Sequence, residues 1–323
     1  MFRYVTGRFA ESLVVLAIMS FVIYGLIGLM PGDPIDLMIA ANPKLTPADA
    51  ERLKALHGLD QPIHARYLAW LEGAVRGDFG YSRLYTKPVA DVLLPRLAST
   101  LVLLGASLAL SLAIAVPLGV YAALRPYSRA DYAINFACFA GISVPPFWLA
   151  LLLIILFAVI LGWLPAGGME TVGKGGVLDR VQYMVLPIAT LTILSVGGFT
   201  RFMRASMLQT LRQDYIRTAR AKGVSERRMV VGHALRNALI PLVTVIALSF
   251  GSLFSGALIT ETMFAWLGMG KTIYDAILGN DYNLALIGLL FATILTLVGN
   301  FLADIAYVWL DPRVSLAGGG PGR

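Results

Sequence analysis

Six long apolar runs constrain this chain more than any other feature of its sequence. A helix needs about 20 residues to cross a hydrocarbon core about 30 Å thick, and each run reaches that length. Backbone that faces lipid must satisfy its own hydrogen bonds, so all six runs are predicted to be helices. Of the 323 residues, 58% are hydrophobic and only 14% are charged, which excludes an ordinary soluble domain. We predict an all-α integral membrane protein whose spans are residues 9–30, 98–124, 134–162, 184–205, 237–259 and 285–310.

The first run follows two basic residues, Arg3 and Arg8, as a secretory signal would. No small-residue cleavage site follows Met30, and the run is long for a signal, so an uncleaved first span is expected. The only cysteine, Cys138, lies inside another apolar run, and the three histidines are scattered. These residues supply no catalytic or metal-binding cluster. We therefore expect a non-catalytic chain that binds no metal or cofactor.

Lysine and arginine set the expected orientation, because they gather on the cytoplasmic side of membrane proteins. With both termini in the cytoplasm, the inner segments carry a net charge of +9 and the outer segments −2. The overall charge of +7 is thus a topology signal and requires no nucleic-acid partner. Prolines inside the runs predict packing kinks in preference to moving hinges; they are Pro117, Pro145, Pro146 and Pro187.

Residues 31–96 are too polar to span the membrane and too patterned to be disordered. Thr46-Pro47 favours the start of one helix and Gly58 its end. A second amphipathic stretch, residues 62–76, stops at a glycine-rich turn. Since exposed apolar stripes need a partner surface, we predict a small folded cap outside the membrane.

The strongest local signal is a basic segment between the fourth and fifth spans. Between Arg201 and Arg236, both included, there are nine basic and two acidic residues. Gly223 suits a helix C-terminus and Ser225 the following N-cap, which predicts two short helices joined by a tight turn. Such a segment can anchor to lipid headgroups, bind DNA as a helix-turn-helix, or dock a soluble partner. The flanking spans leave no domain core behind a DNA-binding motif, and docking is favoured.

The segment resembles the cytoplasmic EAA-type loop of binding-protein-dependent ABC importer permeases. That pattern is Glu-Ala-Ala, three residues, glycine, and nine residues before Ile-x-Leu-Pro. Ala219, Gly223 and Leu235 match it, and Pro241 falls where a further proline often lies. The chain departs from the pattern at four positions, which hold Arg217, Thr218, His233 and Arg236.

Those departures resemble the peptide and nickel branch of the family, in which Ala-Arg-Ala-Lys-Gly precedes His-Ala-Leu-Arg-Asn-Ala. Further strings, in order along nearly the whole chain, look like the same branch. Leu267 departs from it, because a proline usually precedes the glycine there. The matching strings are Pro31-Gly32-Asp33-Pro34, Gly58-Leu59-Asp60-Gln61-Pro62, Gly77-Asp78-Phe79-Gly80, Pro145-Pro146-Phe147-Trp148, Glu261-Thr262-x-Phe264 and Asp311-Pro312-Arg313.

The resemblance implies the type I ABC importer permease fold, with six transmembrane helices and a periplasmic cap, in the bacterial inner membrane. It divides the chain into a first span (1–30), the cap (31–96), a core permease domain (97–310) and a cytoplasmic tail (311–323). The expected partners are a second homologous permease in a heterodimer, two cytoplasmic ABC ATPases that use ATP and Mg, a periplasmic or lipid-anchored solute-binding protein, and membrane lipid.

In this family the EAA-type loop, here about 212–232, is the coupling helix seated in a groove of the ATPase. Small residues are expected to allow close backbone approach, and basic residues to make polar contacts with the ATPase. The coupling residues implied by the resemblance are Arg217, Ala219, Arg220, Lys222, Gly223, Ser225 and Arg228.

Candidates for the translocation path come from helical spacing. Ser249, Ser252 and Ser255 share a face of span five, and Asn300 shares a face of span six with Asp304. Such a stripe of small residues can line a wet passage, but it more often marks close helix packing. Asp304 lies near the inner end of its span, where it can cap local contacts.

Di- or oligopeptides are the favoured cargo, with nickel chelates, opines and glutathione-like solutes as alternatives. A secondary transporter or channel would need no ATPase, but the middles of the spans lack the charges that ion coupling requires. A membrane-embedded enzyme would need the clustered catalytic groups that this chain lacks. The string from Ala265 to Thr272 resembles a phosphate loop, yet it follows a membrane helix, so we predict a turn on the outer side.

Overall fold

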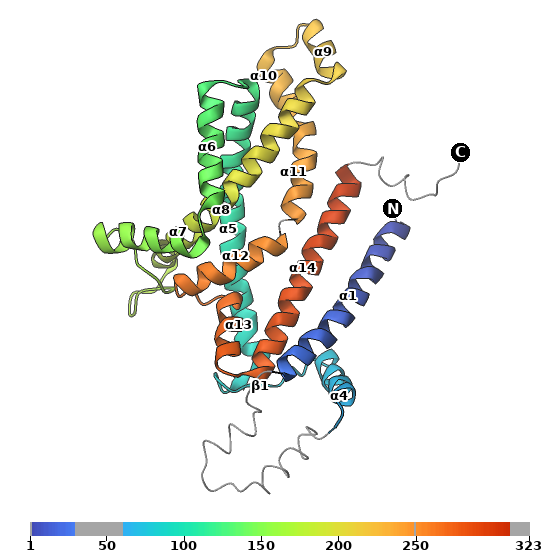
Figure 1. Ribbon diagram of the computed structural model, residues 1–323, viewed down its shortest axis with the longest axis vertical. Coiled ribbons are helices and arrows are strands. Elements are labelled where there is room, and N and C mark those ends of the chain that lie inside the picture. Colours follow the sequence, from blue (N-terminus) through green and yellow to red (C-terminus); the bar gives the residue numbers. More distant parts are fainter. Residues whose placement is uncertain (1, 30–60, 249, 311–323) are drawn as a thin grey trace, which may run out of the picture.

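The computed structural model describes residues 2–29, 61–248 and 250–310, and in that part the chain is almost wholly helical (Figure 1). In chain order the elements are α1 (Phe2–Gly28), α4 (Ile63–Val75), β1 (Tyr81–Ser82), β2 (Lys87–Pro88), α5 (Val89–Leu124), α6 (Arg129–Ser143), α7 (Pro146–Leu153), the π-helix η1 (Ile154–Ile160), α8 (Val177–Leu211), α9 (Asp214–Ala221), α10 (Glu226–Arg228), the π-helix η2 (Met229–Leu235), α11 (Arg236–Leu248), α12 (Phe250–Met263), α13 (Met269–Leu278) and α14 (Tyr282–Leu310).

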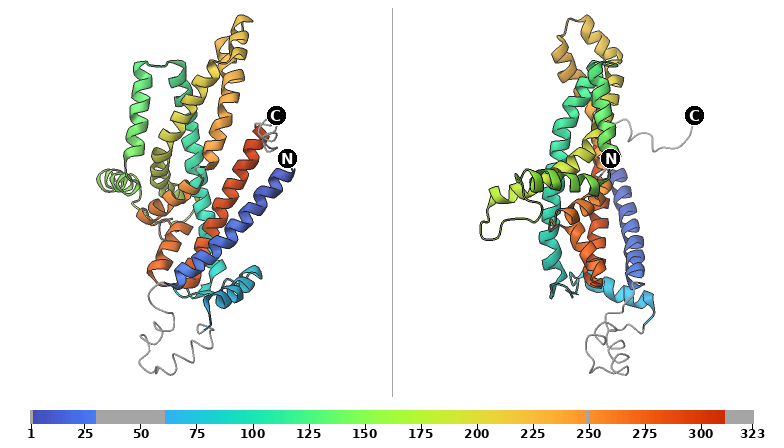
Figure 2. Two further views of the ribbon diagram at one scale, coloured as in Figure 1. Left: turned by 45° about the vertical axis from the view of Figure 1, so that its right-hand side comes forward. Right: turned by 60° about the vertical axis from the view of Figure 1, so that its left-hand side comes forward.

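The long helices lie side by side and give the described part an elongated shape (Figures 1 and 2). α5 runs along most of the length of the described part and packs against α8. α6 and α11 also contact α8. α1 lies along α14, where Arg8 Nε is 3.3 Å from an Asp304 carboxylate oxygen. α9 and α10 project at one end, and α4 lies at the other with the antiparallel β1–β2 hairpin.

Four helices in the described part are long and apolar enough to cross a membrane: Val5–Gly28, Val89–Leu124, Val177–Leu211 and Tyr282–Leu302. They correspond to the predicted first, second, fourth and sixth spans. α5 begins at Val89, nine residues before the predicted span at 98. Val89 and Leu93 are buried in a core cluster with residues of α13 and α14, so tertiary packing extends this helix into the predicted cap segment.

The predicted third span, residues 134–162, is not one straight helix. α6 and the helix formed by α7 and η1 meet at an angle of 102°. Proline lacks an N–H and forces the residue before it into extended backbone, and Val144 has φ −82° and ψ 127° before Pro145. The prolines therefore make a full break where a packing kink is predicted, and α7 extends sideways, away from the long helices (Figure 1).

The predicted fifth span, residues 237–259, falls on α11 and α12, on either side of Ser249, which lies outside the described residues. Neither helix is among the four candidates. The described residues therefore hold four membrane-crossing helices, or five if the bent pair is one span. The total of six stays a prediction.

The predicted cap is described only from residue 61 onward, and its first predicted helix lies outside the described residues. The second predicted helix is α4, which packs on α1 through aromatic rings. The Tyr67 hydroxyl shares a 2.7 Å hydrogen bond with Ser20, and the Trp70 ring lies 5.5 Å from that of Tyr24. The β1–β2 hairpin is held by Asp281, whose carboxylate accepts hydrogen bonds from the Ser82 hydroxyl at 2.5 Å and the Leu84 N–H at 3.0 Å.

Candidate functional site

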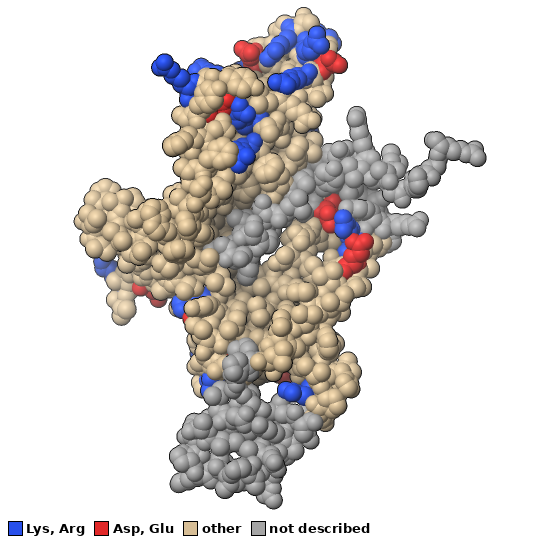
Figure 3. Space-filling view, viewed as in Figure 1, with Lys and Arg blue, Asp and Glu red and all other residues tan. Residues whose placement is uncertain are grey.

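The basic segment predicted to dock a partner, residues 212–232, forms the end of the molecule that carries α9 and α10. Figure 3 shows Lys and Arg side chains gathered over this end. The two predicted helices are present, but only the first is short. The second begins at Glu226 and continues through η2 into α11. The segment is therefore a helical elbow set directly on two long helices.

Gly223 ends α9 in the left-handed conformation, with φ +76°. Its N–H donates to the Arg220 carbonyl oxygen at 3.0 Å, and the Val224 N–H donates to that of Ala219 at 3.2 Å. This pair of bonds is the usual closure of a glycine-terminated helix, and it confirms the predicted helix end. A Cβ at Gly223 would meet no atom of the described residues within 4 Å, so the left-handed backbone conformation alone favours glycine here. Ser225 occupies the N-cap position of α10 without a side-chain capping bond.

One apolar side chain fixes α9 to the helices behind it. Ile216 is fully buried in a core cluster with Met203 and Met207 of α8 and with Met229 and Ala234 of η2. Burying a side chain of this size contributes about 1.5–3 kcal/mol. The elbow is therefore fixed to the long helices by apolar packing of Ile216, and it is not connected to them by a flexible loop alone.

The other predicted coupling residues face outward, with Ala219 half-buried. Two arginines pair within the segment over long distances: Arg217 with Asp214 at 3.4 Å, and Arg220 with Glu226 at 3.9 Å. Exposed ion pairs of this kind contribute little to folding, so their charges stay available to a partner surface. Lys222 and Arg228 are exposed as well.

Tyr215 of α9 lies near the Asn237 side chain at the start of α11. Burial raises the pKa of its phenol, while a hydrogen bond with the Asn237 side chain opposes that rise. The phenol therefore stays neutral near pH 7. Arginine, lysine and carboxylate groups set the charge of the elbow.

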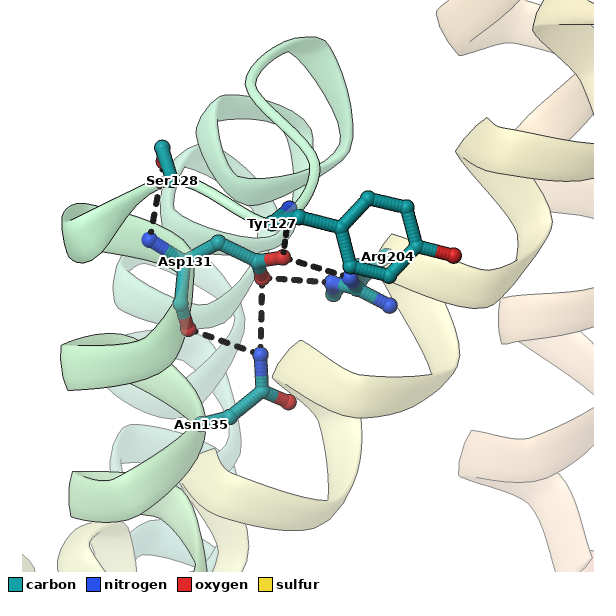
Figure 4. Close-up of polar contacts among 5 residues, drawn as sticks. All are labelled: Tyr127, Ser128, Asp131, Asn135 and Arg204. Atoms are coloured by element: carbon teal, nitrogen blue, oxygen red, sulfur yellow. Dashed lines mark hydrogen bonds and ion pairs between the residues drawn. The ribbon is translucent and has the colours of Figure 1, made fainter.

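A charged clamp, Asp131 with Arg204, lies two helical turns before α8 ends (Figure 4). Arg204 donates from Nε to Oδ1 and from Nη2 to Oδ2, each at 2.6 Å. The same carboxylate accepts hydrogen bonds from the Tyr127 N–H at 2.8 Å and the Asn135 side chain at 2.7 Å. The Asp131 side chain is only 3% exposed, although it lies in the first turn of α6. The clamp ties the α5–α6 turn to the helix that carries the elbow.

The phosphate-loop-like string is a turn at residues 265–268 followed by the first residues of α13, and it closes on a carboxylate of this chain. Glu261, in the last turn of α12, is fully buried. The Thr100 hydroxyl donates to Glu261 Oε1 at 2.5 Å, and the Lys271 N–H donates to Oε2 at 3.0 Å. A Cβ on Gly268 would lie 2.1 Å from Oε1, so glycine is needed for close approach. The carboxylate thus accepts a backbone N–H of this segment, the kind of donor that a phosphate loop offers to phosphate.

Asn300 is the one predicted pathway residue whose side chain belongs to the described part, and it is exposed on α14. Ser249 lies outside the described residues, as do the side chains of Ser252 and Ser255. Asp304, one turn after Asn300, pairs with Arg8 of α1 and thus caps a contact between two helices. The pathway assignment stays a prediction.

The sequence pattern gives little sign of the clamp or of the Glu261 site. Asp131 and Arg204 are 73 residues apart, and a count of topology charges treats each of them alone. One signal is nevertheless present, because a carboxylate at the border of an apolar run is costly unless it is paired. Glu261 carries the same signal, and Thr100 lies 161 residues from it.

Comparison with known proteins places this geometry in a family. Residues 115–316 match the family described as "Binding-protein-dependent transport system inner membrane component", and residues 1–104 match the N-terminal family of membrane components of these systems. The oligopeptide transport system permease protein AppB of Bacillus subtilis is 40% identical over 97% of this chain and 99% of its own. The dipeptide transport system permease protein DppB of Escherichia coli is 34% identical over 90% of this chain and 92% of its own.

A solved structure supports the same fold. The MetNI methionine ABC transporter, in inward-facing conformations, has a TM-score of 0.55 and 20% sequence identity, over 68% of this chain and 96% of the matched chain. The family match covers more than half of the chain and agrees with its apolar helices. The chain belongs to the multi-pass inner-membrane permeases of binding-protein-dependent ABC importers, in their dipeptide and oligopeptide branch.

Proposed function

We propose that this chain forms half of the translocation path for di- or oligopeptides that an external binding protein delivers. The names of AppB and DppB, which refer to oligopeptide and dipeptide transport, support this cargo. Nickel chelates, opines and glutathione-like solutes are the alternatives within the same machinery. The other half of the path comes from a second, homologous permease in a heterodimer.

Two cytoplasmic ATPases hydrolyse ATP with Mg for this chain, which is not itself catalytic. The coupling residues are those of the elbow, from Arg217 to Arg228. The seating of the elbow carries this proposal: Ile216 is buried while the basic side chains around it face outward. A partner that closes on α9 can move α8 and α11 together, because a stiff element contacted in two states transmits force where a flexible loop does not.

The full architecture has six crossings, with both termini in the cytoplasm and α11–α12 as the fifth. The cap formed around α4 lies on the periplasmic side, opposite the elbow. The gathering of Lys and Arg at the elbow end supports this orientation, since basic residues favour the cytoplasmic side (Figure 3). The chief rival is a secondary transporter or channel that needs no ATPase.

Co-purification and reconstitution test this function. The permease pair, the ATPases and the binding protein are placed in lipid vesicles, and uptake of a labelled dipeptide is measured with and without ATP. We expect peptide-loaded binding protein to stimulate ATP hydrolysis and uptake to depend on ATP. Uptake by the permease pair alone, driven by an ion gradient, would overturn the proposal.

A further inference from the structure

A hollow of about 850 Å³ opens between the first turns of α8, the start of α5 and the segment that leads into α8. Small-molecule sites commonly enclose about 300–1,000 Å³, so a dipeptide fits its size. Met169, Val181 and Met184 give it an apolar wall, and Arg96 and Arg180 also line it. The hollow lies at the N-terminal end of α8 and the elbow follows its C-terminal end, so the length of α8 separates them (Figure 1).

The two arginines are held in place without a carboxylate. Arg180 lies over the ring of the buried Trp266, with its guanidinium carbon 5.8 Å from the ring centre, and its Nη2 is 3.5 Å from the Ser99 hydroxyl. Arg96 donates from Nη1 to the Leu267 carbonyl oxygen at 3.4 Å. Among the described residues, no Asp or Glu oxygen lies within 4.0 Å of either guanidinium. Each guanidinium has five N–H donors, so most remain unused.

Asp179, which precedes Arg180 in the sequence, already has hydrogen-bond partners of its own. Asp179 accepts hydrogen bonds from the Thr171 N–H at 2.6 Å and the Thr171 hydroxyl at 2.7 Å, which ties it to the preceding loop. Arg180 is therefore left for a ligand, and guanidinium groups bind carboxylates through paired, charge-assisted bonds. Glu170 lines the same hollow and supplies an acceptor for an ammonium group.

We propose that this hollow receives peptides at the outer mouth of the path, with the C-terminal carboxylate bound by Arg96 and Arg180. The proposal rests on the proposed function and adds a substrate site to it. A lipid headgroup phosphate offers the same oxyanion chemistry, so the test must separate the two sources.

Cysteine labelling in the assembled transporter, held in phosphatidylcholine nanodiscs without ATP or binding protein, provides the test. Val181→Cys places a thiol on the wall of the hollow, where the native side chain is 48% exposed, while the native Cys138 is buried. Reaction rates are measured with an anionic methanethiosulfonate (sulfonatoethyl) and a cationic one (trimethylammonioethyl). Because charged clefts concentrate counter-ions roughly tenfold or more, the anionic reagent should react faster by about that factor. Adding Arg180→Gln or Arg96→Gln should reduce this preference.

Lys174→Gln is the matched control, because Lys174 is a cation of the same loop that does not line the hollow. It should leave the preference unchanged. Millimolar L-alanyl-L-alanine should protect the thiol, whereas its C-terminal amide should not. Equal rates for both reagents, equal protection by both peptides, or protection by added phosphatidylglycerol in place of the dipeptide would overturn the site. ATP hydrolysis stimulated by loaded binding protein is measured in the same nanodiscs, so a failure of the site is distinguished from a failure of the proposed function.

Discussion

Arg204 and Asp131, 73 residues apart in sequence, share two contacts of 2.6 Å that join α8 to the first turn of α6. α9 follows α8 after only two residues, so a displacement of α9 reaches α8 directly. If the proposed coupling displaces α9, we expect the clamp to pass that motion on to α6. A buried ion pair is by itself poor evidence for stability. A substitution that removes one partner nevertheless destabilises the fold, because it leaves the other charge buried and uncompensated.

Asp131→Asn should therefore destabilise the chain by about 2–3 kcal/mol, since it removes the charge and keeps the shape. The remaining amide cannot accept both guanidinium bonds and the Tyr127 N–H as the carboxylate does. Thermal unfolding in detergent measures the loss of stability. The ratio of peptide transported to ATP hydrolysed measures coupling, and it should fall as well.

Glu72→Gln is the control for the clamp. Glu72 and Arg76 also pair at 2.6 Å, but their side chains are 63% and 74% exposed. Solvent screens such a pair, so the substitution should change neither melting temperature nor coupling appreciably. Equal effects of Asp131→Asn and Glu72→Gln would contradict the role of the clamp.

Gly223→Leu should abolish ATP hydrolysis stimulated by loaded binding protein while leaving membrane insertion intact. A left-handed φ of +76° costs a residue with a Cβ roughly 1–2 kcal/mol, and a bulky side chain would also stand on the surface offered to the ATPase. Gly223→Asn is the milder variant, because asparagine tolerates this conformation. It should retain most of the stimulation. Full stimulation by Gly223→Leu would remove Gly223 from the coupling residues.

Ile216→Ala should loosen α9 from its seat without unfolding the bundle. Removing the buried atoms of an isoleucine costs about 2–5 kcal/mol where the site cannot collapse, and here most of that loss falls on an eight-residue helix. Hydrogen exchange of the amides of α9 should become markedly faster. Val231→Ala, at a 58% exposed position of η2, should leave exchange in α9 unchanged.

Local chemistry made part of this fold predictable. The apolar runs of α1, α5, α8 and α14 and the glycine end of α9 depend on neighbouring residues, so the sequence pattern was sufficient for them. The bend between α6 and α7 was not predictable in size, because Pro145 and Pro146 announce an interruption while packing sets its angle of 102°. The early start of α5 has the same cause, since Val89 is buried against helices nearly 200 residues away.

The candidate sites divide in the same way. The elbow was predictable, because its turn residues and charges are contiguous. The clamp, the Thr100–Glu261 bond and the arginine-lined hollow were not, because each depends on residues brought together from distant helices. Their common signal is a charged residue at the border of an apolar run, which requires a partner.

Two substitutions in the string 265–272 distinguish a closed turn from a phosphate loop. Lys271 contributes its backbone N–H to Glu261, while its side chain pairs with Asp275 at 2.6 Å. Lys271→Ala keeps that N–H and loses a partly buried pair within one helix, worth about 1 kcal/mol, so transport should be nearly unchanged. Gly268→Ala should severely reduce the folded yield, because its Cβ would lie 2.1 Å from a Glu261 oxygen and the buried carboxylate cannot move away freely. Folded yield by size-exclusion chromatography and peptide uptake by the reconstituted transporter measure both variants. A phosphate loop that depends on its lysine would instead lose function with Lys271→Ala, and that result would contradict the structural role of Glu261.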